Sequence, residues 1–192
     1  MYKMMRNIIV FTAAMAICNS TFASDAAIPD DHVSLTISPL HLVTSIVEVN
    51  GEFKVDKNLG VALILGSGTF KTTTVGNSTI QGDTYSIREY GFQVNYYPNS
   101  NFSQGLQYGI EIMKIDLDLI SSNNIKSSGS GVAFGPYLGY KTDLGIGLIL
   151  VSQIGYQGYS VSAKAQDSNG NTASAAGGGG GLLLNLNLGF NF

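Results

Sequence analysis

The chain has 192 residues and a net charge of −3, and only 12% of its residues are charged. That share is about half of the ≈ 25% typical of soluble domains, whereas glycine (24), tyrosine (10) and phenylalanine (9) are abundant. No basic cluster follows the first few residues, so the sequence lacks the electrostatic footprint of a nucleic-acid-binding protein. Low charge with evenly spread apolar residues is typical of alternating strands that face lipid.

Residues 1–23 have the parts of a secretory signal peptide. Lys3 and Arg6 form a basic start, an apolar run follows, and small residues lead to a predicted cleavage after Ala23. The run is too short for a membrane-spanning helix. Cys18, the only cysteine, follows an isoleucine rather than the small residue that lipoprotein processing requires. Removal of this segment leaves no thiol, which excludes disulfides and thiolate sites.

A barrel domain is predicted over residues 33–192, after a periplasmic lead-in at 24–32. Residues 33–38 alternate between apolar and polar, and Pro39 then predicts a β-bulge because proline cannot donate a ladder hydrogen bond. A second strand over 47–55 places three ionisable side chains on one face and apolar residues on the other. If residues 33–55 instead form one bent strand, the count falls from eight to seven and the N-terminal part can plug the lumen.

Further alternating segments complete the predicted eight strands. Their apolar faces lie at residues 59–65, 90–96, 106–112, 132–140, 146–156 and 182–192. Stretches rich in Ser, Thr, Asn and Gly predict long loops at 71–83, 118–130 and 162–181. Short turns are expected near Asp56, Pro98 and Asp143. In outer-membrane barrels the short turns are periplasmic, so both ends of the chain are expected in the periplasm.

The last strand carries the clearest pattern. Leucines and phenylalanines occupy every second position from Leu182 to Phe192, and Asn185, Asn187 and Asn191 lie on the opposite face. A periplasmic barrel of the lipocalin kind would bury the leucines. A transmembrane barrel turns the leucines toward lipid and encloses the amides, which then bond to one another.

The signal peptide, the alternating strands and residues 182–192 make the chain resemble the small eight-stranded outer-membrane barrels of Gram-negative bacteria, of the OmpA/OmpX-like or porin-like families. The resemblance implies an all-β fold, a single antiparallel transmembrane β-barrel in up-and-down order. It also implies location in the outer membrane, contact with lipid and lipopolysaccharide, and a C-terminal assembly signal at Leu188, Phe190 and Phe192 for the barrel-assembly machinery. We expect a monomer.

The lumen of such a barrel is just wide enough to be filled by its inward side chains. Buried charges need partners, so we expect the lysines of the lumen to pair with some of its glutamates. The predicted polar network consists of Glu48, Glu52, Lys54, Glu89, Gln93, Asn95, Glu111, Lys141, Gln153 and Asn185.

The sequence predicts neither an enzyme nor a bound cofactor or metal. His41 lies in a predicted strand near Ser38 and Ser45, but no third group completes a catalytic arrangement, so we interpret it as a polar residue at the membrane interface. Two histidines without cysteines disfavour a transition-metal site. The glycine run at 177–181 lacks the lysine and the helix of a phosphate-binding loop.

The expected function is a structural or surface-interaction role. External loops around Gly76, Asn123 and Gly170 would contact host or envelope ligands. The alternative is a narrow pore for small or apolar solutes, and a third hypothesis is a lipid-modifying enzyme.

Overall fold

The computed structural model describes residues 31–76, 79–99, 101–120, 126–166 and 170–192. The expected signal peptide, nearly all of the expected lead-in and the loop residue Asn123 lie outside these ranges. Within the described residues, no helix has the length and apolar character needed to cross a bilayer.

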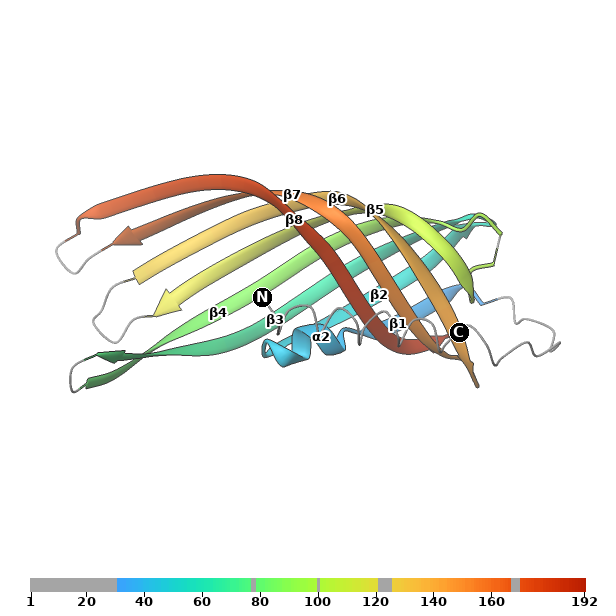
Figure 1. Ribbon diagram of the computed structural model, residues 1–192, viewed down its shortest axis with the longest axis horizontal. Helices are drawn as coiled ribbons and strands as arrows, with labels where there is room; N and C mark the ends of the chain where they lie inside the picture. The colour runs from blue at the N-terminus through green and yellow to red at the C-terminus, as the bar shows by residue number, and fades with distance from the viewer. Residues whose placement is uncertain (1–30, 77–78, 100, 121–125, 167–169) are drawn as a thin grey trace, which may run out of the picture. The chain divides into compact units, whose positions relative to one another are not determined.

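The chain forms a closed antiparallel barrel in which each strand pairs with the next and β1 pairs with β8 (Figure 1). This confirms the predicted all-β fold of eight strands in up-and-down order. The elements are β1 (Val33–Ile37), α2 (Pro39–Val43), β2 (Ile46–Asp56), β3 (Leu59–Gly76), β4 (Thr79–Tyr96), β5 (Gly105–Ile120), β6 (Lys126–Gly145), β7 (Leu148–Gln166) and β8 (Thr172–Asn191).

The two faces of the wall carry the chemistry that the alternation predicts. On β2, Val47 and Phe53 are 57% and 48% exposed, whereas Glu48 and Glu52 are 3% and 6% exposed. On β8, Leu184 is exposed and Asn187 is buried. The apolar side chains therefore cover the outside, as in a barrel surrounded by lipid. A barrel that buries its leucines, the periplasmic alternative, is excluded.

Pro39 does not form the predicted β-bulge. It occupies the first turn of the short helix α2, where proline is favoured because its missing N–H needs no partner there. Leu40 and Leu42, which were expected to extend the first apolar face, belong to this helix, as does His41. β1 and β2 are separate strands, so the alternative of one bent strand is wrong.

The predicted long loops are mostly strands. β3 and β4 remain paired as far as Gly76 and Thr79, and the hairpins β5–β6 and β7–β8 extend in the same way. Gly and Asn have low intrinsic strand preference, but a ladder that is already aligned continues through such residues. We call this end of the barrel the extended end, and the opposite end, where the short turns and Phe192 lie, the turn end.

The first hairpin is much shorter than the others. The ladder between β1 and β8 ends at Ile37 and Leu188, and that between β2 and β3 ends at Ile46 and Gly68. Beyond these pairs, the facing edges of β3 and β8 have no strand partner among the described residues. Helix α2 contacts β2 and β8 at this seam, and Figure 1 shows the longer strands running past it.

The polarity of the two faces of the wall reverses between the turn end and the extended end of the longer strands. On the outside of β4, the exposed position next to Tyr90 toward the extended end is Arg88, which pairs with Asp118 of β5 at 2.7 Å. On the inside of β5, the inward positions beyond Glu111 are the apolar Met113, Ile115 and Leu117, and the last two line a mainly apolar cavity. The wall is therefore apolar outside and polar inside near the turn end, and charged outside and apolar inside at the extended end.

Candidate functional site

Most of the predicted lumen residues lie inside the barrel. Eight of the ten are at most 6% exposed: Glu48, Glu52, Glu89, Gln93, Asn95, Glu111, Lys141 and Gln153. Asn185 also points inward and is half-buried. Lys54 is partly exposed near the turn end, beside a bulge in the β2–β3 ladder.

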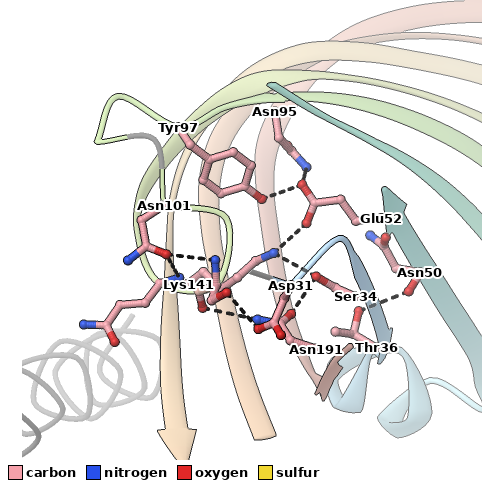
Figure 2. A network of polar contacts seen from close by, with 12 residues as sticks. Asp31, Ser34, Thr36, Asn50, Glu52, Asn95, Tyr97, Asn101, Lys141 and Asn191 are labelled. Carbon is pink, nitrogen blue, oxygen red and sulfur yellow. Dashed lines mark hydrogen bonds and ion pairs between the residues drawn. The ribbon is translucent and has the colours of Figure 1, made fainter. Parts of the chain in front are cut away.

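Lys141 and Glu52 form the centre of a network that we call the inner plug: Ser34, Glu52, Asn95, Tyr97, Lys141 and Asn191. The Lys141 ammonium lies 2.7 Å from Glu52 Oε2 and donates to Ser34 Oγ at 2.9 Å. Ser34 in turn donates to Asn191 Oδ1 at 2.7 Å, so the network joins β1, β2, β6 and β8 (Figure 2). Lys141 is completely buried, which makes its ion pair essential to its burial.

Two buried aromatic residues, Tyr97 of the inner plug and the adjoining Phe102, cover Lys141 on the side of the turn end. Tyr97 is 1% exposed, and its hydroxyl donates to Glu52 Oε1 (Figure 2). Phe102 is 2% exposed and its ring centroid lies 4.0 Å from the Lys141 nitrogen, a cation–π contact. Tyr97 directly precedes Pro98, where the sequence predicts a short turn. Its alternation with Gln93 and Asn95, which also face the lumen, is the sequence signal that places it inside.

A second set of side chains fills the lumen above the inner plug. Gln93 donates to Glu111 at 2.6 Å and to Gln153 at 3.2 Å. Asn185 donates to the same two acceptors at 3.0 and 2.9 Å. This amide network joins β4, β5, β7 and β8 across the lumen, so that part of the lumen is filled by protein.

The space left within these two networks is small. The cavity beside Gln107, Asn187 and Val151 has a volume of about 10 Å³, roughly the room for one water molecule. Among the described residues, the half of the barrel near the turn end is therefore largely filled by these side chains.

His41 belongs to α2 and not to a strand as predicted, and its place at the membrane interface stays a prediction. It lines a cavity of the barrel, where its Nδ1 atom lies 2.5 Å from Oε2 of Glu48. Glu89 completes a group whose three ligand atoms lie within 4.8 Å of one another. We call these three residues the His41 cluster. A sequence reading cannot find it, because it depends on α2 folding toward β2.

The extended end contains a mainly apolar space beside the strands β5 to β8. A partly open cavity of about 640 Å³ is lined by side chains that include Ile115, Leu117, Tyr159 and Val161. It shares Ile115, Ala133 and Gln157 with a cavity of about 250 Å³ that reaches His41, Glu89 and Glu111. We call the two together the cup. The cup is apolar along its wall and polar at its floor.

The glycine run at 177–181 belongs to the wall of β8 and forms no loop. A Cβ atom at Gly179 would lie 2.7 Å from the Tyr159 hydroxyl, and one at Gly180 would clash with Tyr156. The run therefore makes room for two tyrosine rings that lie across β8, one on each face of the sheet.

The predicted assembly residues lie on the outer surface at the turn end. Leu188, Phe190 and Phe192 are 37%, 46% and 67% exposed. The Phe192 N–H donates to the Val33 carbonyl at 2.8 Å, so the last residue extends the hydrogen-bonded ladder between β8 and β1. Their role as an assembly signal stays a prediction.

Comparisons with known proteins find similarity at the level of structure. No protein-family model matches the chain, and no curated protein sequence matches it. A major outer membrane protein from Thermus thermophilus aligns with a TM-score of 0.49 and 15% identity, covering 85% of this chain and 100% of that chain. CarO2 from Acinetobacter baumannii aligns with a TM-score of 0.37 and 10% identity, covering 84% of this chain and 98% of that chain.

Proposed function

We propose that this chain is an integral outer-membrane protein that is sealed near its turn end and binds small apolar or amphipathic molecules in its cup. The observation that carries this proposal is the reversal of polarity along the strands, from a polar interior near the turn end to an apolar interior at the extended end. Beyond the apolar belt, charged residues such as Arg88 and Asp118 face outward while Ile115 and Leu117 line the interior. Apolar side chains that face an open interior lower their free energy when an apolar molecule covers them.

The size and lining of the cup suit a small molecule. Its apolar part has a volume of about 640 Å³, within the range of roughly 300–1,000 Å³ of small-molecule sites. Its floor offers polar groups from His41, Glu111 and Gln157. A ligand with an apolar body and one polar end would satisfy both regions.

The position of the cup supports uptake from outside the cell. Short turns face the periplasm in outer-membrane barrels, so the extended end would project from the outer surface. The seam between β3 and β8, which α2 fills in part, would give a bound apolar molecule a sideways route toward lipid. A protein with this cup would handle apolar solutes, as in the predicted alternative of a conduit for them, and would not be purely structural.

Binding can be tested with the barrel in lipid nanodiscs and the fluorescent apolar probe N-phenyl-1-naphthylamine. Val161→Glu puts a charge into the cup, whereas Ser160→Glu puts the same charge on the outer face of the same strand. We expect the first variant to reduce probe affinity at least about tenfold and the second to leave it within about twofold. An apolar probe in the cup would cover the new charge without compensating it, and such desolvation of a charge costs several kcal/mol. Equal affinities in both variants would contradict the proposal.

Conductance separates the cup from an open pore. The inner plug and the amide network fill the lumen, so planar bilayers that contain the protein are expected to show no steady channel openings. Steady openings would favour the pore and overturn the sealed barrel.

A second function, contact with other macromolecules at the cell surface, is supported by the unpaired strand edges. Beyond Gly68 on β3 and Leu188 on β8, backbone groups along these edges have no strand partner among the described residues. Such edges can add a strand from a partner. Cross-linking that captures no partner in intact cells would argue against this role.

A further inference from the structure

Three buried polar atoms converge in the His41 cluster. They are Nδ1 of His41, Oε2 of Glu48 and Oε2 of Glu89. Nδ1 of His41 lies 2.5 Å from Oε2 of Glu48, a contact that becomes an ion pair when the imidazole is protonated, whereas Oε2 of Glu89 has no hydrogen-bond partner among the described residues. Glu48 and Glu89 are 3% and 5% exposed. Buried polar atoms without partners are uncommon in native proteins and call for an explanation.

The backbone brings the two carboxylates together across a glycine. Glu48 of β2 and Glu89 of β4 both pair with Gly66 of β3, so all three residues lie at the same level of the wall. A Cβ atom at Gly66 would lie 2.5 Å from Oε2 of Glu89. The Glu89 carboxylate thus lies across Gly66, in space that any other residue would occupy.

The charge of the cluster calls for a cation. With both carboxylates ionised, the cluster carries a net negative charge whether or not the imidazole is protonated, and buried charges are stabilised by partners or by metal ions. The buried Lys141 is bonded to Glu52, and Arg88 pairs on the outside with Asp118. The neighbouring Glu111 is different, because it accepts hydrogen bonds from Gln93 and Asn185.

We propose that His41, Glu48 and Glu89 bind one divalent transition-metal ion at the floor of the cup. One imidazole nitrogen and two carboxylate oxygens are ligands that suit Zn²⁺ and related ions. Their ligand atoms lie within 4.8 Å of one another. Zinc–nitrogen and zinc–oxygen bonds are about 2.0–2.2 Å long, so small side-chain adjustments bring all three onto one ion.

The cavity beside the cluster gives the ion a route of entry. His41 and Glu89 both line the space of about 250 Å³ that continues into the cup. An ion bound there is reached from the extended end, because the amide network and the inner plug fill the lumen on the other side.

The test is a titration of the folded barrel in detergent with Zn²⁺, and with Co²⁺ as a spectroscopic probe. We expect one ion per chain and a visible Co²⁺ absorption band that Zn²⁺ removes. His41→Ala, Glu48→Gln and Glu89→Gln should each weaken binding more than about tenfold, since each removes a ligand. Glu111→Gln is the matched control, a carboxylate in the same cavity that should leave the affinity within about threefold.

Folding is checked separately, because a variant that fails to fold loses the site for a trivial reason. Glu48→Gln and Glu89→Gln preserve side-chain shape and remove buried charges, so both should keep the heat-modifiable gel migration of a folded barrel. Gly66→Ala tests the geometry with the ligands intact, since its Cβ atom displaces Glu89, and it should weaken binding to a similar degree.

Absence of Zn²⁺ and Co²⁺ binding by the folded wild type would overturn this inference, as would binding that the ligand variants leave unchanged. The apolar-ligand proposal is tested by Val161→Glu and a probe without metal, so either can fail alone. A folded barrel that binds the probe but no ion keeps the cup and removes the metal site.

Discussion

The ammonium nitrogen of Lys141 on β6 lies 2.7 Å from a carboxylate oxygen of Glu52 on β2, with Lys141 completely buried. The two residues are 89 positions apart in the sequence and come from strands that are not neighbours in the sheet. Their contact crosses the lumen, so it can form only once the barrel has closed. It ties opposite walls together and fills the centre of the inner plug.

Replacing Lys141 by methionine is expected to destabilise the barrel by about 3–5 kcal/mol, because the Glu52 carboxylate then stays buried without its cation. Urea unfolding of the barrel in detergent measures this loss. Lys114→Met is the matched control, since Lys114 pairs with Asp116 at 3.1 Å on the outside and is 57% exposed. It should cost less than about 1 kcal/mol. Equal losses would contradict a special role of the buried pair.

The double variant Glu52→Gln with Lys141→Met should be more stable than Lys141→Met alone. Removing both charges leaves no unpaired ion inside, and buried ion pairs are often replaceable by neutral groups. A double-mutant cycle measures the coupling between the two residues. Additive losses would mean that the two charges do not interact.

The aromatic floor of the inner plug should control conductance. Tyr97→Ala combined with Phe102→Ala removes two buried rings, 1% and 2% exposed, from beneath Lys141. Water can then reach the charged pair, and we expect discrete openings in planar bilayers that the wild type lacks. Tyr108→Ala, which removes a ring from the outer surface, serves as the control. Silence of the double variant would show that other side chains seal the lumen.

Gly189 is required in the ladder between β1 and β8, where the barrel closes. It pairs with Thr36 of β1, and a Cβ atom there would clash with the Leu35 carbonyl oxygen. We expect Gly189→Ala to cost roughly 1–3 kcal/mol or more, as overpacking typically does. Gly181→Ala is the control, because its Cβ atom would have its nearest neighbour at 4.0 Å. Heat-modifiable migration at increasing temperature compares the two, and similar transitions would contradict the expectation.

Phe192 allows assembly to be separated from stability. Its side chain is 67% exposed, while its backbone N–H donates to the Val33 carbonyl, so Phe192→Ala keeps the backbone bond between β8 and β1. We expect refolding in detergent to be unchanged within about 1 kcal/mol, as for most surface substitutions, and the amount of protein in the outer membrane of cells to fall. An unchanged amount in cells would argue against the assembly signal.

The sequence by itself predicted which way the side chains face. Alternation is a local property of an extended backbone, so Glu48 and Glu52 could be placed inside and Leu184 outside before any strand was paired. Closure of an eight-stranded barrel follows from the number of such segments, because a closed barrel is the arrangement in which strands can cross a bilayer. The burial of Lys141 was predicted for the same reason.

Only the tertiary structure decided where strands end and which inward side chains meet. Residues 162–166 and 172–181 look like parts of a loop, yet they pair because their neighbours are already aligned. Tyr97 turns into the lumen because the ladder parity continues one residue beyond β4. His41 reaches Glu48 because Pro39 starts a helix, and Glu89 reaches them across Gly66. Contacts across a lumen depend on strand register and barrel closure, which local alternation does not specify.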